Sequence, residues 1–336
     1  MRPTRRLATD PDSPDPAVVA EAAAILRAGG LVAFATETVY GLGAVATDEA
    51  AVAGIFEAKG RPSTNPLIVH AANVNMAMAY AAIWPRAAAL LADAFWPGPL
   101  TIVVPKTPAI PDLATAGQPT VGLRVPGLAV ARRLIEVVGA PLAAPSANRS
   151  NGISPTTADH VFMDLDGRID AILDSGPCPA GLESTVVDLS DGPPAILRPG
   201  PIAALRIALA LEVWPIAEGG ERGRSPGQSS VHYAPRTPTY RVEVVEELVG
   251  REFPTGTVGL RFGPSPASNV FPQLGGGSGD CSNPHAAARN LYALLRRLDA
   301  GDPPMILIVM PPDEPEWRAV RDRLLRASRP LGGHVK

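Results

Sequence analysis

The sequence predicts a mixed α/β protein with two domains. Short apolar runs alternate with stretches of helical periodicity over most of the 336 residues. Two of these runs, 184–190 and 195–198, lie too close in the chain for a helical crossover, so the first sheet must include antiparallel strands. A second, shorter alternation follows a segment rich in Gly, Ser and Pro near residue 215.

The first domain begins with a helix and a buried strand. Asp and Pro at 15–16 are typical of an N-cap and first turn, and the Gly pair at 29–30 ends this helix. The apolar run 31–36 predicts a buried strand that ends in polar residues, and Asp48 caps a second helix that extends through Lys59. Further strands are predicted at 66–70, 100–105, 121–126, 141–148, 169–176, 184–190 and 195–200, and helices at 75–94, 128–138 and 156–164.

The second domain is predicted to be a small, Rossmann-like α/β unit with parallel strands. We place the first domain at 1–215, a linker at 216–238 and the second domain at 239–336. The second domain has predicted strands at 240–245, 257–262 and 305–310, and predicted helices at 285–301 and 314–328.

Composition excludes several classes of protein. A hydrophobic content of 46% with 19% charged residues is typical of a folded chain. The formal charge of −3 is unlike the basic field of a protein that holds nucleic acid stably. Two cysteines, Cys178 and Cys281, are too few for a disulfide framework or a four-ligand zinc site. No signal peptide or membrane-spanning run is visible, so we expect a cytoplasmic protein without membrane contact.

One glycine pattern formally matches a dinucleotide-binding motif. The residues "GLGAVA" at 41–46 follow a predicted strand, as in the GxGxxG/A fingerprint. The acidic residue that this fingerprint requires about twenty positions later is missing, because that region reads "STNPLIVH". The chain also lacks the phosphate-loop, serine-hydrolase and metalloprotease motifs, so any nucleotide site must be built differently.

Lys59 and Arg61 are candidates for binding an anion. Lys59 is one of only three lysines in the chain, and it precedes Gly60 at a predicted helix end. A lysine there can simply stabilise the helix dipole. Arg61, two residues later, brings a second positive charge to the same end, which is unfavourable unless an anion such as a triphosphate lies between them. A lysine provides a compact, mobile charge, whereas arginine requires a fixed planar geometry.

Polar residues also gather at the ends of other predicted strands. The run "PSANRSNGISPT" at 145–156 follows an apolar strand, which favours a small-molecule site over a plain loop. Ser184 lies at a strand start and Arg198 at a strand end. Arg124 lies inside the apolar "VGLRVP", where its guanidinium needs a carboxylate or phosphate partner, so it binds a ligand or forms a structural salt bridge.

Taken together, these motifs resemble a known family. "TETVYGLG", "KGRPSTNPLIVH", "GLRVP", "PSANRSNGISPT", "ESTVVDL" and "ILRPG", in this order, are similar to the YrdC-type threonylcarbamoyl-AMP synthases. "SPGQSSVHYAP" followed by a small α/β domain resembles the two-domain members. The resemblance implies a YrdC-like mixed-sheet catalytic domain. It also implies a reaction of L-threonine, bicarbonate and ATP to threonylcarbamoyl-adenylate and pyrophosphate, for later transfer to tRNA by a downstream threonylcarbamoyl transferase.

The same resemblance implies roles for individual residues. Lys59 and Arg61 would be catalytic. ATP would be held by Lys59, Arg61, Ser146, Asn148, Ser154, Arg198 and Tyr233, and threonine or the carbamate by Thr36, Tyr40, His70, Arg124 and Ser184. We expect Mg²⁺ to be bound mainly through the nucleotide phosphates, with no dedicated protein metal site.

The chain departs from the family pattern at two places. Ala35 stands where proline is usual before "TET", and "QSSV" at 228–231 replaces more basic and aromatic residues before "HYAP". In similar proteins this linker closes over the nucleotide. We therefore expect 216–238 to act as a lid that excludes water from the labile adenylate, with His232 and Tyr233 as its contacts.

Two other functions compete with this interpretation. A carbamoyl-adenylate-forming unit of a hydrogenase-maturation carbamoyltransferase resembles the same domain, but such proteins carry zinc-binding cysteine pairs that two cysteines cannot provide. An RNA-binding protein without catalysis is the other alternative. The charge of −3 and the 5% aromatic content argue against a stacking or phosphate-tracking surface.

Overall fold

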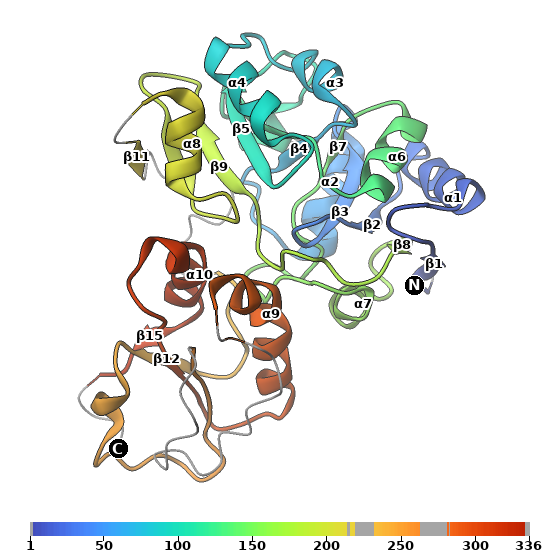
Figure 1. The fold of residues 1–336 in the computed structure, drawn as a ribbon. Helices are drawn as coiled ribbons and strands as arrows, with labels where there is room; N and C mark the ends of the chain where they lie inside the picture. The colour runs from blue at the N-terminus through green and yellow to red at the C-terminus, as the bar shows by residue number, and fades with distance from the viewer. Residues whose placement is uncertain (1–2, 214–215, 219–231, 263–280, 282, 333–336) are drawn as a thin grey trace. The chain divides into compact units, whose positions relative to one another are not determined.

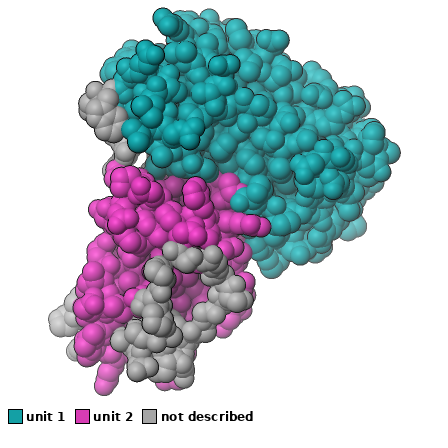
Figure 2. Space-filling view, viewed as in Figure 1, with its two compact units in different colours: residues 1–150, 154–179, 183–228 teal, residues 151–153, 180–182, 229–336 magenta. Residues whose placement is uncertain are grey.

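The structure is a computed structural model, and it describes residues 3–213, 216–218, 232–262, 281 and 283–332. The chain forms two compact units (Figure 2). Unit 1 contains residues 1–150, 154–179 and 183–228, and unit 2 contains 151–153, 180–182 and 229–336. The domain limits drawn from the sequence, at 215 and 238, stay a prediction, because most of the intervening segment lies outside the described residues.

Unit 1 is built on an eleven-stranded mixed sheet (Figure 1). The strand order is β1-β8-β2-β3-β7-β4-β6-β5-β9-β10-β11. The sheet contains parallel pairs such as β4 with β6 and antiparallel pairs such as β9 with β10, which confirms the mixed sheet. The strands are β1 (Arg5–Ala8), β2 (Val32–Ala35), β3 (Tyr40–Val45), β4 (Ile68–His70), β5 (Leu100–Pro105), β6 (Thr120–Arg124), β7 (Leu142–Ala143), β8 (Ala171–Asp174), β9 (Thr185–Asp188), β10 (Ala195–Arg198) and β11 (Ala217–Glu218).

Helices pack on both faces of this sheet. Along β2, Ala33 and Ala35 belong to one buried apolar cluster, whereas Val32 and Phe34 belong to another, as the alternation of side chains in a strand requires. The second cluster includes residues of α1 and α6, and the first includes residues of α2, α4 and α8. The helices are α1 (Pro16–Arg27), α2 (Glu49–Lys59), α3 (Val74–Met78), α4 (Arg86–Phe95), α5 (Asp112–Thr115), α6 (Ala129–Val138), α7 (Ala158–Leu165) and α8 (Ala204–Leu211).

Helix α2 begins and ends where the sequence predicts. The Asp48 carboxylate accepts hydrogen bonds from the backbone N–H groups of Ala50 and Ala51, at 3.0 and 3.1 Å. Gly60 has φ 61° and ψ 41°, the left-handed conformation that ends helices and favours glycine. Lys59 is therefore the last residue of α2. The predicted helix at 75–94, in contrast, is two helices: α3 ends at Met78, and α4 begins at Arg86 after Pro85 as its N-cap.

The glycine-rich "YGLGAV" is a strand, β3, and not a phosphate-binding turn. It pairs with β2 on one side and β7 on the other. A Cβ added to Gly43 would lie 2.8 Å from the Phe34 ring, so glycine here allows that ring to pack against the strand. The Phe34 ring in turn contacts His70 edge to face, with 6.3 Å between ring centroids. The glycine pattern therefore serves packing beside the site.

Unit 2 contains a four-stranded sheet in which every pair is parallel, in the order β13-β14-β12-β15. This agrees with the predicted small α/β unit. Its regular elements are β12 (Thr239–Val242), η1 (Val245–Leu248), β13 (Val258–Leu260), α9 (Pro284–Ala300), β14 (Ile306–Val309), η2 (Pro315–Trp317), α10 (Arg318–Ala327) and β15 (Arg329–Pro330). The unit also includes two short loops, 151–153 and 180–182, whose neighbours in the chain belong to unit 1.

Candidate active site

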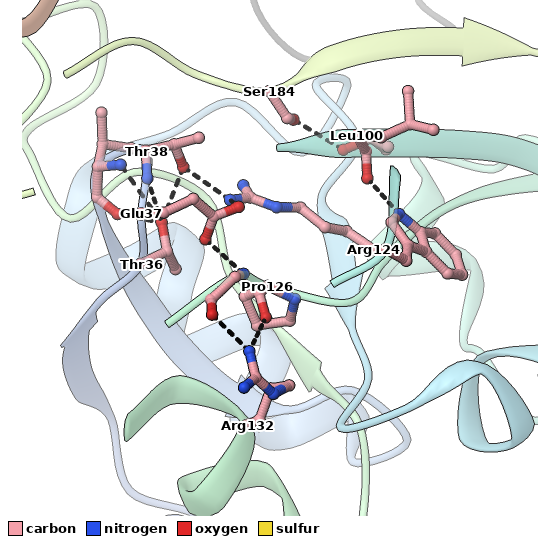
Figure 3. Close-up of polar contacts among 12 residues, drawn as sticks. Thr36, Glu37, Thr38, Leu100, Arg124, Pro126, Arg132 and Ser184 are labelled. Atoms are coloured by element: carbon pink, nitrogen blue, oxygen red, sulfur yellow. Dashed lines mark hydrogen bonds and ion pairs between the residues drawn. The ribbon is translucent and has the colours of Figure 1, made fainter. Parts of the chain in front are cut away.

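Arg124 at the end of β6 is the centre of a buried polar network (Figure 3). Its Nη2 donates to Glu37 Oε1 at 2.6 Å and to Thr38 Oγ1 at 2.9 Å. Three strands separate β2 from β6, which corresponds to about 19 Å across a sheet. The turn at 36–39 and the long Arg124 side chain must therefore reach toward each other across the sheet. Arg124 Nε is buried and has no hydrogen-bond partner in the structure.

The hydroxyl groups beside Arg124 have defined directions. Thr36 Oγ1 donates to the carbonyl of Val39 at 2.7 Å, so its contact with Thr38 Oγ1 at 2.8 Å must have Thr38 as the donor. Thr38 Oγ1 therefore presents a lone pair to Arg124, as the 2.9 Å contact requires. The Thr36 hydroxyl closes the turn internally. Its contact to substrate, implied by the family resemblance, stays a prediction.

His70 lies next to Arg124 on the neighbouring strand. The two residues are register partners in the parallel β4–β6 pair. Burial, with a smaller contribution from the Arg124 charge, lowers the pKa of His70 to about 3, so its imidazole is neutral at physiological pH. His70 Nδ1 is buried without a hydrogen-bond partner. Two buried polar atoms on adjacent strand ends, Arg124 Nε and His70 Nδ1, are thus available for hydrogen bonds to a ligand.

Lys59 is fully enclosed at the end of α2. Its side chain is 1% exposed, and Nζ donates to the carbonyls of Ser146 and Asn148, both at 2.5 Å. Burial lowers the pKa of Lys59 well below its usual range, and the charges of Arg61 and Arg149 lower it further, while Asp164 opposes them. Lys59 thus joins the helix end to the 146–148 loop, and a bound anion would relieve the unfavourable charge.

Other candidate residues shape the loops around Lys59. Arg61 is buried and donates to the carbonyls of Asn65 and Pro66, at 3.2 and 3.0 Å, which fixes the loop after α2. Ser146 Oγ donates to Asn148 Oδ1 at 2.6 Å, and Asn148 Nδ2 donates to the Arg149 carbonyl at 2.8 Å. The amide of Asn148 is therefore held in one orientation.

Ser154, Ser184 and Arg198 belong to a third set of contacts. Ser154 Oγ donates to Glu183 Oε1 at 2.6 Å. The Arg198 guanidinium donates to Ser184, from Nε to the carbonyl and from Nη2 to Oγ, both at 3.1 Å. Ser184 Oγ also lies 2.8 Å from Thr101 Oγ1 on β5. Arg198 at the end of β10 is thus fixed to the residue that precedes β9.

Tyr40 and Cys178 are buried close to the 36–39 turn. Tyr40 donates its hydroxyl to the Gly176 carbonyl at 2.7 Å, and burial raises the pKa of the phenol. Burial also raises the pKa of the Cys178 thiol, so this cysteine is not a reactive thiolate. Both side chains therefore pack and orient the turn.

Tyr233, predicted to contact ATP, lies in unit 2. Its side chain is 1% exposed, and its ring centroid lies 5.7 Å from that of Tyr292. The fully buried Arg323 guanidinium lies 5.3 Å from the same ring. The segment 219–231 of the predicted lid lies outside the described residues, so the lid stays a prediction.

The structure thus groups the candidates of unit 1 into three sets of contacts, around Arg124, around Lys59, and around Ser154, Ser184 and Arg198. Sequence reasoning missed Glu37 and Glu183, the two carboxylates within these networks. The sequence offers one signal for Glu37: a buried Arg124 needs an acidic partner, and Glu37 is the acid in the middle of "TET".

Within the described ranges, no group of three or more His, Cys, Asp or Glu residues could hold a metal ion. No helix in these ranges is both long and apolar enough to span a membrane.

Two family models match the chain. Residues 24–200 match the Sua5, YciO and YrdC model, which is described as "Telomere recombination". Residues 202–329 match the model described as "Threonylcarbamoyl-AMP synthase, C-terminal domain". The matches leave out only the first 23 and last seven residues and the single residue 201 between them.

Known proteins are similar over most of the chain. "Threonylcarbamoyl-AMP synthase" of Pyrococcus abyssi is 41% identical over 91% of this chain and 93% of its own. The protein of the same name from Bacillus subtilis is 40% identical, over 97% and 96%. A crystal structure of Pyrococcus abyssi Sua5 complexed with L-threonine has a TM-score of 0.84 at 35% identity, and covers 97% of this chain and 99% of that one.

Proposed function

The chain belongs to the threonylcarbamoyl-AMP synthase family, and we propose that unit 1 condenses L-threonine, bicarbonate and ATP to threonylcarbamoyl-AMP and pyrophosphate. The structural observation that carries this proposal is an excess of buried positive charge. Among the described residues of unit 1, the buried cations are Lys59, Arg61, Arg124 and Arg198, and the buried carboxylates are Glu183 and Asp188. Glu37, whose side chain is 12% exposed, neutralises Arg124, so four cations face three carboxylates. Buried cations need counter-charges, and triphosphate, bicarbonate and the threonine carboxylate provide them.

We propose that the network around Arg124 binds threonine. The buried Arg124 Nε has no hydrogen-bond acceptor, and a carboxylate is the preferred partner of a guanidinium. Neutral His70 presents Nδ1 nearby without adding a positive charge. A neutral imidazole suits the amine of the substrate, because it does not repel the ammonium form and has a lone pair that can accept a proton. The contacts implied for Thr36, Tyr40 and Ser184 belong to this end of the site.

We propose that Lys59, Arg61 and Arg198 bind the ATP phosphates, with Ser146, Asn148 and Ser154 shaping the nucleotide site. Lys59 is held by two carbonyls but keeps the capacity of an ammonium for a third hydrogen bond. The carbamate forms a bond from its oxygen to the α-phosphorus, while the bond from that phosphorus to the pyrophosphate oxygen breaks. The cations stabilise the negative charge that accumulates on the departing pyrophosphate.

Other participants follow from the chemistry of these substrates. We propose that Mg²⁺ enters with ATP and is held mainly by phosphate oxygens, where it would neutralise charge during the transfer. Because threonylcarbamoyl-AMP is a mixed anhydride, we propose that a separate transferase passes the threonylcarbamoyl group from it to tRNA adenosine.

The reaction is tested by incubating the full chain with ATP, Mg²⁺, bicarbonate and labelled threonine. We expect pyrophosphate and a labelled adenylate in equal amounts, and neither product when bicarbonate is removed. Threonine-dependent pyrophosphate release without bicarbonate would indicate direct threonyl-adenylate formation and would contradict the proposal.

Arg124→Ala is expected to raise the KM for threonine about 100-fold and to leave the KM for ATP nearly unchanged. The carboxylate loses its charged partner, whereas the phosphates contact other cations. Steady-state kinetics with each substrate varied in turn checks this, with thermal unfolding as the control because Glu37 also loses its partner. An unchanged threonine KM would leave Arg124 a purely structural ion-pair residue.

Two substitutions of Tyr233 distinguish the predicted contact with ATP from a purely structural role in unit 2. We expect Tyr233→Ala to destabilise unit 2 by about 3–5 kcal/mol, because the ring is enclosed by Tyr292 and Arg323. Tyr233→Phe keeps the ring and should fold normally. If the hydroxyl contacts ATP, Tyr233→Phe should raise the ATP KM in a stably folded protein. An unchanged ATP KM in this variant would contradict the predicted contact.

A further inference from the structure

A chain of hydrogen bonds connects Arg132, the loop after β6, Glu37 and Arg124 (Figure 3). It extends beyond the residues proposed to contact substrate. Arg132 on α6 donates from Nη1 to the carbonyls of Pro126 and Gly127, at 2.9 and 2.5 Å. The Gly127 N–H donates to Glu37 Oε2 at 2.7 Å. Glu37 Oε1 accepts from Arg124 at 2.6 Å. The loop therefore holds Glu37 through Oε2, and Glu37 holds Arg124 through Oε1.

Close packing supports this connection. A Cβ added to Gly127 would lie 3.1 Å from Glu37 Cδ and 3.2 Å from Cγ, so the carboxylate lies directly against the glycine backbone. The side chains of Arg124 and Glu37 are 4% and 12% exposed, so water does little to screen their interaction. A guanidinium held at Nη2 by two acceptors can neither rotate nor translate freely.

We propose that Glu37 and Arg132 are positioning residues for threonine, which set the plane of Arg124 so that its Nε faces the substrate carboxylate. This inference rests on the proposed function, in which Arg124 binds threonine. Glu37 also cancels the charge of Arg124. The Arg124–Glu37 pair therefore attracts a triphosphate less than Lys59 or Arg198 does, which directs ATP and threonine to different ends of the site.

The test compares Glu37→Gln and Arg132→Met with wild type in the full chain. Glutamine keeps the shape of Glu37 but weakens two charge-assisted hydrogen bonds, so we expect the threonine KM to rise about tenfold. Arg132→Met should raise it severalfold, and Arg132→Lys should recover most of the loss, because an ammonium can still donate to both carbonyls. The ATP KM should stay within about twofold in each variant.

Arg133→Met is the matched control. Arg133 lies next to Arg132 on α6, is half exposed and pairs only with Glu136 among its described contacts, at 3.3 Å. It should have wild-type kinetics. If Glu37→Gln or Arg132→Met acted only by loosening the packing, the KM values for threonine and ATP would both rise, and the unfolding temperature would fall.

A double-mutant cycle distinguishes positioning from a separate effect. In the Arg124→Ala background, Glu37→Gln should cause no further rise in threonine KM, because its effect acts through Arg124. A full tenfold rise in that background, equal rises for threonine and ATP, or no change in either single variant would overturn the inference. If Arg124→Ala itself leaves the threonine KM unchanged, the assignment of Arg124 in the proposed function fails as well. A rise of about 100-fold in threonine KM for Arg124→Ala, without any effect of Glu37→Gln, overturns the positioning role alone.

Discussion

Lys59→Met is expected to lower kcat about 10²–10³-fold, the loss typical when one preorganised donor is removed from a developing anion. Methionine keeps the length of the side chain but removes the charge and the donors to Ser146 and Asn148. The 146–148 loop then loses the two hydrogen bonds from Lys59 Nζ, and the phosphates lose a cation. Pyrophosphate release under saturating substrates measures the effect.

Two further variants make the Lys59 experiment specific. Lys59→Arg keeps the charge. A planar guanidinium is larger than the ammonium and does not fit the enclosed space between the two carbonyls, where Lys59 is only 1% exposed. We therefore expect a similar loss of kcat. Wild-type turnover in Lys59→Arg would show that charge alone is sufficient. Lys106→Met is the control, because the described contacts of the Lys106 ammonium are local, to the Ile110 carbonyl and the Asp112 carboxylate. Its replacement should leave kcat unchanged.

Gly200→Ala is expected to reduce the free energy of unfolding by about 3 kcal/mol or more. An ideal Cβ at this position would lie 2.3 Å from Thr185 N, 2.6 Å from Ser184 C and 2.7 Å from Glu183 O. These are backbone atoms, and Thr185 N is fixed by a hydrogen bond to Pro99 O at 3.0 Å. The strain cannot be relieved by a side-chain rotation. Urea denaturation measures the change.

Gly54→Ala is the matched control for Gly200→Ala. Gly54 lies within α2, and a Cβ there would make ordinary contacts with Leu31, at 3.6 to 3.8 Å. Alanine in a helix interior is favoured over glycine by up to about 1 kcal/mol, so this variant should be equally or more stable than wild type. Equal stability of Gly200→Ala and wild type would mean that the "ILRPG" turn can move away from Ser184 without cost.

The sequence alone predicts most of the elements of unit 1 because their signals are local. The end of α2 at Lys59 follows from Gly60, and the strands that carry His70 and Arg124 follow from their apolar runs. Strand β3 was missed because its two glycines are typical of a turn. Only the fold shows that Gly43 leaves room for the Phe34 ring on the paired strand.

The site was less predictable where it depends on distant pairing. Arg124 was expected to need an anionic partner, and the choice between substrate and salt bridge could not be made from its neighbours in the sequence. The structure shows the salt bridge, in which Glu37, 87 positions away, accepts from Nη2 while Nε is left without a partner. Substrate binding by the same side chain stays a proposal. The predicted role of Tyr233 rests on the family resemblance and on its place in the linker, and neither contains information about Tyr292 or Arg323.

Unit 2 is assembled from three separate segments of the chain, which limits how this protein can be recombined with its relatives. The loops 151–153 and 180–182 belong to that unit, and Arg296 Nη2 donates to the carbonyl of Ile153. A Cβ on Gly181 would lie 2.5 Å from the Ala288 carbonyl oxygen, so this loop fits α9 only as glycine. A chimaera joined at a single point near residue 228 would combine these loops from one parent with α9 from another. Transplanting the C-terminal part intact therefore requires three exchanged segments, and crossovers selected in gene shuffling should preserve the parental combination of all three.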